Sequence, residues 1–198
     1  PLKEKDYSWM DRIRTEHPRM FLTKADIPQI RRTAFSFENK TYIDMKQRAD
    51  RLIDPSTLKP YPIVFEDPLA KTGEGKENRN YGFYAADAAM MYLISGDGKY
   101  LDLAKYILKE LSAYYQLRVD NNLNIEWAAF SQICAMAAYD WIYNDLKPYD
   151  RDWIGKTLFN AMCDVAWHGP GIREGRYREN ISAPTTGCYG VTVLPWYV

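Results

Sequence analysis

Histidine and cysteine are scarce in this chain of 198 residues, which contains two of the former and three of the latter. Two histidines cannot build a His-rich metal centre, so we expect neither a metal site nor a cofactor. The cysteines are odd in number and lack the CxxC spacing that is typical of zinc and redox sites. Cys134, Cys163 and Cys188 therefore indicate neither a disulfide framework nor a zinc cluster.

An excess of charge of either sign is also missing, because 26 Lys and Arg residues balance 26 Asp and Glu residues. Nucleic-acid-binding proteins are usually distinctly basic, so we expect no nucleic-acid partner. The sequence lacks an uncharged apolar run of about 18 residues, so we expect no membrane-spanning helix. The hydrophobic share of 46% excludes a disordered chain. Length and composition together are typical of one domain or a large part of one.

What the sequence does contain is helical periodicity along most of its length. In the leading part, residues 1–77, a helix is predicted from Thr23, a good N-cap followed three residues later by an acidic side chain, to about Thr33. A second helix is predicted over about 38–53, before an Asp-Pro pair. Residues 54–80 are rich in Pro and Gly. A loop of that length is typical of a segment that wraps a domain or carries function.

The second part, residues 78–198, alternates between two kinds of predicted helix. Two segments almost without charge predict helices that are buried on all sides. The segments that follow them place their charges along one side only, which predicts half-buried helices. A third apolar run, starting at Ser182 or Ala183, begins the pattern again after a loop rich in Gly and Arg. In chain order these segments are 81–94, 98–116, 127–139, 148 to about 165 and 182–198.

The alternation has a period of about 45–50 residues, which is typical of repeated pairs of helices. Hairpins with one buried and one half-buried helix form an (α/α) toroid when they close into a ring, and an α-solenoid when they stay open. We predict an all-α fold in which antiparallel hairpins form part of an (α/α) toroid. The chain stops inside an apolar run, so we interpret residues 1–198 as the N-terminal portion of an incomplete ring. Residues 1–77 supply leading helices and a long loop, and residues 78–198 the inner and outer helix pairs.

The buried helices of such a ring all run in one direction, so their N-termini gather at one rim. Exposed N–H groups and helix dipoles there favour anions. The third predicted helix start follows the arginine-rich loop, whose guanidinium groups suit carboxylates or sulfates. Amide, guanidinium and aromatic groups together suit an anionic sugar polymer. The candidate substrate-binding residues are Arg79, Asn80, Tyr81, Glu126, Trp127, Arg173, Arg176, Arg178 and Glu179.

Other interpretations of the same residues stay open. Asn80, Asn124 and Asn180 are also suitable helix caps, and the arginine loop is also compatible with a solvated turn. Asp87 and Asp140 are single carboxylates in the buried helices, and as a pair they would suit the general acid and base of a helical-ring glycosidase. A lone buried Asp is more often bound to a backbone group or a tyrosine. A noncatalytic helical scaffold that binds glycan or protein is the remaining alternative.

Three stretches of the sequence resemble the heparinase II/III-type polysaccharide lyases. They are residues 17–23 (HPRMFLT), residues 84–92 (YAADAAMMY) with the Gly-Asp pair that follows, and residues 138–148 (AYDWIYNDLKP). Their order and spacing, which span most of the chain, carry the resemblance more than any single motif does. Within the first stretch, His17 precedes a proline, and we interpret it as structural.

The resemblance implies a toroid followed by a β-sandwich part, and cleavage of uronic-acid-containing polysaccharides by β-elimination. This reaction needs a group that neutralises the uronate carboxylate, a base for the C5 proton and an acid for the departing O4. Asn180, at the predicted start of the third buried helix, best matches the neutralising position. The Tyr and His that serve the other roles in related enzymes are expected beyond Val198, so we expect this chain alone to be inactive.

The same resemblance implies the partners and the location of the protein. The expected partners are an acidic polysaccharide substrate and the C-terminal remainder of the enzyme. A periplasmic or secreted location follows from this class of substrate and is not read from a targeting signal.

Overall fold

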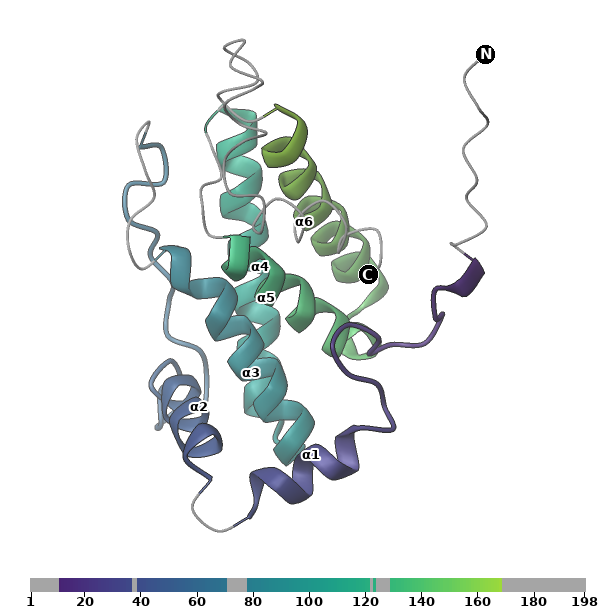
Figure 1. The fold of residues 1–198 in the computed structure, drawn as a ribbon. Helices are drawn as coiled ribbons and strands as arrows, with labels where there is room; N and C mark the ends of the chain where they lie inside the picture. Colours follow the sequence, from purple (N-terminus) through teal and green to yellow (C-terminus); the bar gives the residue numbers. More distant parts are fainter. Residues whose placement is uncertain (1–10, 37–38, 71–77, 122, 124–128, 169–198) are drawn as a thin grey trace.

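The computed structural model describes residues 11–36, 39–70, 78–121, 123 and 129–168, and for Arg79, Ala129 and residues 159–168 it describes the backbone alone. The regular structure of these ranges is helical (Figure 1), so the predicted all-α fold is confirmed. The only β-type pairing within them is an isolated bridge between Ile53 and Pro60. The predicted apolar run over residues 182–198 lies outside the described residues.

Six α-helices follow one another in the described ranges. They are α1 (Ile27–Ala34), α2 (Lys40–Asp50), α3 (Tyr81–Ser95), α4 (Gly98–Asp120), α5 (Ala129–Trp141) and α6 (Pro148–His168). Gly96 ends α3 with a φ of 73°, and Asp97 caps α4 by accepting a hydrogen bond from the backbone N–H of Lys99. Helix α4 continues to Asp120, one turn beyond its predicted end.

The start predicted for the first helix is wrong, because α1 begins at Ile27 and not at Thr23. Thr23 donates its backbone N–H and its hydroxyl to the carboxylate of Asp26, at 2.7 and 2.8 Å, and accepts the amide of Asp26 at its own carbonyl. These bonds close residues 23–26 into a turn of their own, and the helix begins after it. The second helix is also shorter than the predicted range of about 38–53. Asn39 is its N-cap, so it begins at Lys40, and it ends at Asp50.

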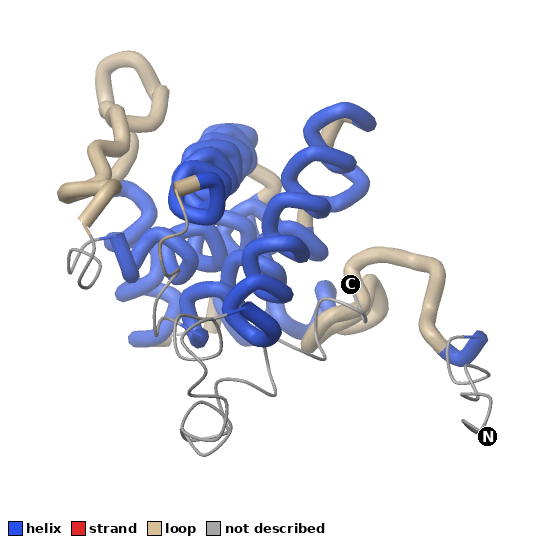
Figure 2. The backbone as a smooth tube through the Cα atoms, turned by 90° about the horizontal axis from the view of Figure 1, so that it is seen from above, coloured by secondary structure: helices blue, strands red, loops and turns tan. Residues whose placement is uncertain are grey.

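The four longest helices form two layers (Figures 1 and 2). Helices α3 and α5 pack against each other in one layer, and α4 and α6 pack against each other in the second, with α4 covering α3. An ion pair of 2.8 Å between Lys109 of α4 and Asp150 of α6 joins the second layer. The nearly uncharged helices therefore form one layer and the amphipathic helices form the other, as the alternation of the sequence predicts.

Small residues allow α3 and α5 to approach closely near their N-termini. The amide of Gly82 donates to Oγ of Ser131 at 3.1 Å, and a Cβ placed on Gly82 would lie 1.9 Å from the carbonyl oxygen of Ser131. Near the other ends of the two helices, Ile94 and Trp141 line the same groove. Helices α3 and α5 therefore run in the same direction, which confirms for this pair the shared direction predicted for the buried helices.

The prediction that α3 and α5 are buried on all sides is wrong for one side of each helix. Phe83 of α3 is 41% exposed and Phe130 of α5 is 67% exposed. Partly exposed residues continue this side of both helices, where α1 and α2 contact α3 without covering the side completely. The lack of charge in these two helices correctly indicated that they are largely buried. It did not show how many sides of each helix other helices cover. We call this side the open stripe, which consists of Phe83, Asp87, Met90, Phe130, Cys134 and Trp141.

Part of the predicted wrapping loop, residues 63–70, lies against α4. Arg118, which is fully buried in α4, donates hydrogen bonds to two carbonyl oxygens of the loop at 2.9 and 3.2 Å. The ring of Phe65 stacks on Tyr114 of α4, with 4.3 Å between the ring centres. The loop is thereby anchored beside the N-terminus of α3, where the predicted rim begins.

Asp50, the last residue of α2, connects that helix to the start of α4. Its carboxylate pairs with Lys46 one turn earlier and accepts hydrogen bonds from Lys99 at 3.1 Å and from the hydroxyl of Tyr100 at 2.7 Å. Burial pushes the pKa of Asp50 upward, but these hydrogen bonds outweigh it and lower the pKa to about 2. The ionised carboxylate therefore stabilises the folded state.

The contact between Gly82 and Ser131 predicts that Gly82→Ala is destabilising. The added methyl would overlap backbone and side-chain atoms of Ser131, and overpacking of this kind costs about 1–3 kcal/mol or more. Urea unfolding measures the effect. Gly98→Ala is the matched control, because a Cβ there meets no atom within 4 Å, and we expect it to be neutral or to stabilise by up to about 1 kcal/mol. Equal stability of the two variants would contradict the close approach.

The lowered pKa of Asp50 predicts a pH-dependent contribution to stability. An acid whose pKa is depressed by folding contributes fully above its unfolded pKa of about 3.9, and the contribution is lost as the pH falls through about 2. Asp50→Asn should therefore lower the thermal midpoint near neutral pH, with a difference from the wild type that shrinks between about pH 4 and about pH 2. Asp152→Asn, which breaks an exposed pair with Lys156, serves as control. A difference that stays constant across this range would refute the prediction.

Candidate functional site

The predicted rim begins at the N-terminus of α3, where the loop covers part of it. Asn78 is buried there and exchanges hydrogen bonds with the backbone of Glu66, both at 2.9 Å. Asn80 is the N-cap residue of α3, although its side chain makes no capping hydrogen bond. Tyr81 packs edge-on against Phe65 with 5.1 Å between ring centres. Asn80 and Tyr81 therefore lie at the rim, with Tyr81 in an aromatic cluster shared with the loop.

The rest of the predicted binding set falls largely outside the described part of the chain. For Arg79 the backbone alone is described, at the 3-10 turn that leads into α3. The other candidates, which are not described, are Glu126, Trp127, Arg173, Arg176, Arg178, Glu179 and the candidate catalytic residue Asn180.

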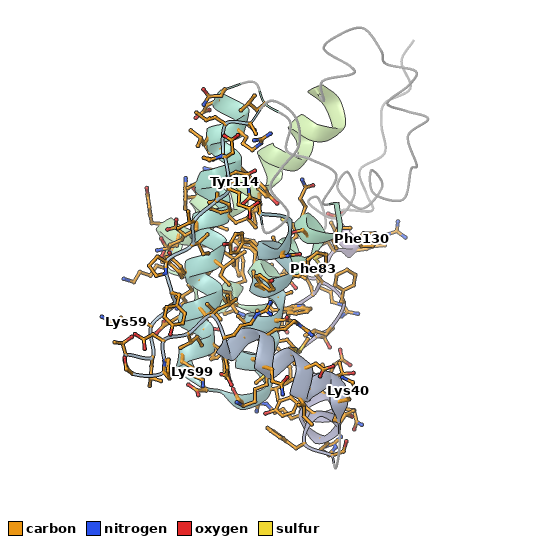
Figure 3. All side chains as sticks on the ribbon, turned by 90° about the vertical axis from the view of Figure 1, so that its left-hand side faces the viewer. Lys40, Lys59, Phe83, Lys99, Tyr114 and Phe130 are labelled. Carbon is orange, nitrogen blue, oxygen red and sulfur yellow. The ribbon has the colours of Figure 1, made fainter. Side chains whose placement is uncertain are left out.

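Two phenylalanines at the rim were missed by the sequence interpretation. Phe83 directly follows Gly82, and Phe130 directly precedes Ser131. Each phenylalanine therefore adjoins the point where α3 and α5 meet. Figure 3 shows both rings on the same side of the molecule. They are exposed aromatic surfaces at the place where the sequence predicts substrate.

Helix α2 runs antiparallel to α3 beside the open stripe and is joined to it by two arginines one turn apart. Arg48 forms a bidentate pair with Asp87, with Nε–Oδ2 and Nη2–Oδ1 distances of 2.6 and 3.0 Å. Arg51 donates to the hydroxyl of Tyr84 at 2.8 Å, and its guanidinium lies 5.2 Å from the centre of that ring. The hydrogen bonds to Asp87 raise the pKa of Arg48 above its ordinary value. Asp87 therefore holds one guanidinium group of α2 and Tyr84 holds the other.

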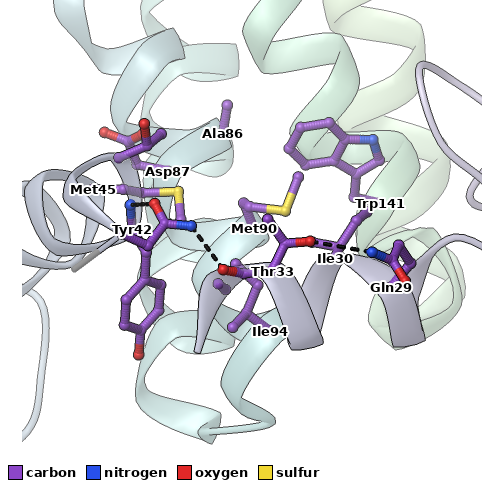
Figure 4. A pocket seen from close by; sticks show the side chains of 13 residues that line it. Gln29, Ile30, Thr33, Tyr42, Met45, Ala86, Asp87, Met90, Ile94 and Trp141 are labelled. Atoms are coloured by element: carbon purple, nitrogen blue, oxygen red, sulfur yellow. Dashed lines mark hydrogen bonds between the residues drawn. The ribbon is translucent and has the colours of Figure 1, made fainter. Parts of the chain in front are cut away.

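An apolar groove of about 460 Å³ continues the open stripe toward the C-terminal ends of α3 and α5 (Figure 4). Met90 and Ile94 of α3 form one side, Ile30 of α1 and Met45 of α2 form the other, and Trp141 lies at one end. The indole is held in place because its Nε1 donates to the carbonyl of Met20 at 2.8 Å. The groove offers shape and apolar surface, and the carboxylate of Asp87, which also lines it, is held by Arg48.

Cys134 lies on α5 in the same stripe, and its thiol has low reactivity. Burial raises the pKa of its thiol, and the negative charge of Asp87 raises it further. A thiol reacts and binds metal as the thiolate, so a raised pKa makes Cys134 a poor nucleophile. No group of three or more His, Cys, Asp and Glu side chains among the described residues is placed to hold a metal ion.

Asp140, the other candidate carboxylate, is fully buried and fully engaged. One oxygen lies 2.5 Å from Nδ1 of His17, and the second accepts the amides of Arg19 and Met20, both at 2.7 Å. The ring of His17 stacks on Tyr143, with 3.7 Å between ring centres. Asp140 therefore fastens the leading segment to the end of α5, and the structural interpretation of His17 is confirmed.

These contacts argue against the helical-ring glycosidase. That hypothesis needs Asp87 and Asp140 to reach one cleft as a general acid and a general base. Asp87 is held by Arg48 in the open stripe, whereas Asp140 faces backbone amides and the imidazole of His17 behind it. The alternative that a lone buried Asp binds backbone groups describes Asp140 correctly.

No protein-family model and no curated protein matches the chain. None of the helices in the described ranges is long and apolar enough to cross a membrane.

The candidate site consists of three neighbouring features, which are the open stripe, the arginines of α2 and the rim at the N-termini of α3 and α5.

The engagement of Asp140 predicts that Asp140→Ala is strongly destabilising. The substitution leaves the buried amide of Met20 and the part-buried amide of Arg19 without an acceptor, at a cost of about 1–3 kcal/mol each, and it removes the partner of His17, so we expect a total loss of about 3 kcal/mol or more. Asp145→Ala, which removes an exposed acceptor for the hydroxyl of Tyr92, should cost less than about 1 kcal/mol. Chemical unfolding measures both free energies. A loss at Asp140 no larger than the loss at Asp145 would show that the leading segment is not held by this carboxylate.

Proposed function

We propose that this chain is the helical N-terminal part of a polysaccharide lyase that cleaves uronic-acid-containing acidic glycans by β-elimination. The observation that carries the proposal is the arrangement of the helices. Two nearly uncharged helices, α3 and α5, run in the same direction in contact at their N-termini, and amphipathic helices lie behind them. An (α/α) toroid of the heparinase II/III type has inner and outer helices related in this way.

A second observation supports the proposal, because two of the stretches that carry the resemblance meet in space. His17 and Met20 of the first stretch are bonded to Asp140 and Trp141 of the third. Asn144, also in the third stretch, donates to the carbonyl of His17 at 3.0 Å. The two motifs are more than 100 residues apart in the sequence, so their contact gives a physical reason for them to occur together.

The reaction assigns distinct tasks to the groups around the scissile bond. A base removes the C5 proton, the electrons form a C4–C5 double bond, and the C4–O4 bond breaks as an acid protonates O4. Charge develops on the uronate carboxylate as the proton leaves, so donors aimed at that carboxylate stabilise the transition state. We assign this task to Asn180 and expect the base and the acid from the C-terminal remainder of the enzyme. The protein would then act on extracellular polysaccharide, in the periplasm or after secretion.

A noncatalytic glycan-binding scaffold is the second candidate, and a specific observation favours it. The carboxylates of the two inner helices are both occupied, Asp87 by Arg48 and Asp140 by the leading segment. The described residues of the inner layer therefore provide binding surface without a free acid or base. The two candidates differ in whether unsaturated products form.

An absorbance assay tests the lyase with the full-length protein that contains this chain. Cleavage of heparan sulfate, chondroitin sulfate or alginate should create unsaturated ends and raise the ultraviolet absorbance. Asn180→Ala should reduce turnover by about 100-fold or more, as the loss of one transition-state donor does elsewhere, with little change in thermal stability. Asn121→Ala, at an exposed asparagine after α4, should leave turnover unchanged. Binding of these glycans without any rise in absorbance would overturn the lyase and leave the scaffold.

A further inference from the structure

The arginines of α2 and the phenylalanines of the rim lie along one side of α3. In the order of the α3 sequence, Phe83 is followed by Tyr84, which holds Arg51, and one turn later by Asp87, which holds Arg48. Phe130 of α5 extends this side across the contact between Gly82 and Ser131. Figure 3 shows Phe83 between α2 and Phe130. Two exposed aromatic rings are therefore followed by two guanidinium groups on a surface that the described residues leave open.

The two guanidinium groups are fixed but not saturated. Asp87 engages Nε and Nη2 of Arg48, and Tyr84 engages Nη2 of Arg51, so Nη1 of each arginine has no hydrogen-bond partner among the described residues. Asp44 on the same helix pairs with Lys40 at 2.5 Å. With Lys40 included, the cluster carries three cations, Lys40, Arg48 and Arg51, against the carboxylates of Asp44 and Asp87.

The space beside these arginines can admit a ligand group. A surface cavity of about 380 Å³ is lined by Asp44, Gln47, Arg48 and Arg51. Arginine presents a planar fork that matches a carboxylate or sulfate, and a guanidinium already held by Asp87 or Tyr84 loses little further freedom on binding. The excess of positive charge and the geometry of the donors are therefore complementary to an anionic group.

The exposed rings of Phe83 and Phe130 complement the apolar faces of sugar rings. Both are large apolar surfaces open to solvent, 41% and 67% exposed. Aromatic side chains offer a broad contact area at low cost in conformational entropy, because few torsions are fixed on binding. A polymer that alternates apolar ring faces with acidic groups matches an arginine–phenylalanine surface better than a purely apolar partner does.

We propose that the arginine–phenylalanine surface, defined as Arg48, Arg51, Phe83 and Phe130, is a binding subsite for the acidic polysaccharide. Sugar faces stack on the two phenylalanines, and the uronate carboxylate or a sulfate binds the free N–H groups of Arg51 and Arg48. This assignment rests on the proposed function for the class of ligand. Tyr84 and Asp87 act as positioning residues that hold the two guanidinium groups toward the glycan.

Calorimetric titration of the 198-residue chain with heparin and alginate oligosaccharides tests the subsite. Arg51→Gln and the double variant Phe83→Ala with Phe130→Ala should each raise the dissociation constant by about tenfold, equivalent to a loss of about 1.4 kcal/mol in binding free energy. Arg32→Gln and Tyr149→Ala are matched controls, since both side chains are exposed and lie on α1 and α6, and they should leave the constant unchanged. Added salt should weaken binding of the wild type more than binding of Arg51→Gln.

Two further ligands separate the contributions of the two residue types. Carboxyl-reduced alginate lacks the anionic group, so it should bind more weakly to the wild type and show no further loss with Arg51→Gln. Dextran, which is neutral throughout, should not compete. Equal binding of heparin by the wild type, Arg51→Gln and the phenylalanine double variant would overturn the subsite.

The occupant of the surface and the proposed reaction can be judged apart. If sedimentation shows that the wild type dimerises and that Phe83→Ala with Phe130→Ala abolishes the dimer without affecting glycan binding, the surface is an interface between copies and the proposal fails. If the full-length enzyme forms unsaturated products and the same variants leave its KM unchanged, the subsite fails while the lyase stands. If the chain binds glycan through these residues and no product ever forms, the subsite stands and the lyase fails.

Discussion

The close contact between α3 and α5 is the constraint on which the rest of the structure depends. Gly82 has no side chain, so its backbone can lie against Ser131 and donate to its hydroxyl. This contact brings two helix N-termini together, and the groove that Ile94 and Trp141 share near the other ends shows that the two helices run in one direction. It also decides which residues are left outside, because Phe83 and Phe130 adjoin the contact and cannot take part in it. The exposed aromatic rim is thus a geometric consequence of the tight packing beside it.

A second constraint acts at the other end of the inner layer. Asp140 collects two backbone amides and an imidazole from the leading segment, and Trp141 adds a bond to the carbonyl of Met20. Each bond joins residues that are more than 100 positions apart in the sequence. Closing so long a loop lowers the conformational entropy of the chain, and the bonds to Asp140 and Trp141 must offset this loss. The same bonds fix the indole that ends the apolar groove. The leading segment therefore shapes the surface of the inner layer although it belongs to neither layer.

The sequence predicts the local features of this fold well and its long-range features poorly. The start of α4 at Asp97 and the end of α3 at Gly96 depend on neighbouring residues, and both are visible as patterns. The open stripe was missed because a lack of charge does not show how many sides of a helix are covered. The spacing of Gly82, Ala85 and Ala89 contained a usable signal, since small residues three and four apart mark the tight side of a helix and Phe83 falls off that side. The partners of Asp140 gave no such signal, because nothing local connects it to His17.

The charges of the inner layer decide how binding and chemistry can be divided in this protein. A general acid or base must exchange a proton freely, and neither Asp87 nor Asp140 can do so without giving up an arginine or the leading segment. An arginine held by a carboxylate loses none of its charge, however, and keeps donors for a second anion. Groups that are unsuited to proton transfer are therefore well suited to hold a charged polymer in place. On this reasoning the helical layer positions the substrate, and any proton transfer falls to side chains outside the two inner helices described here.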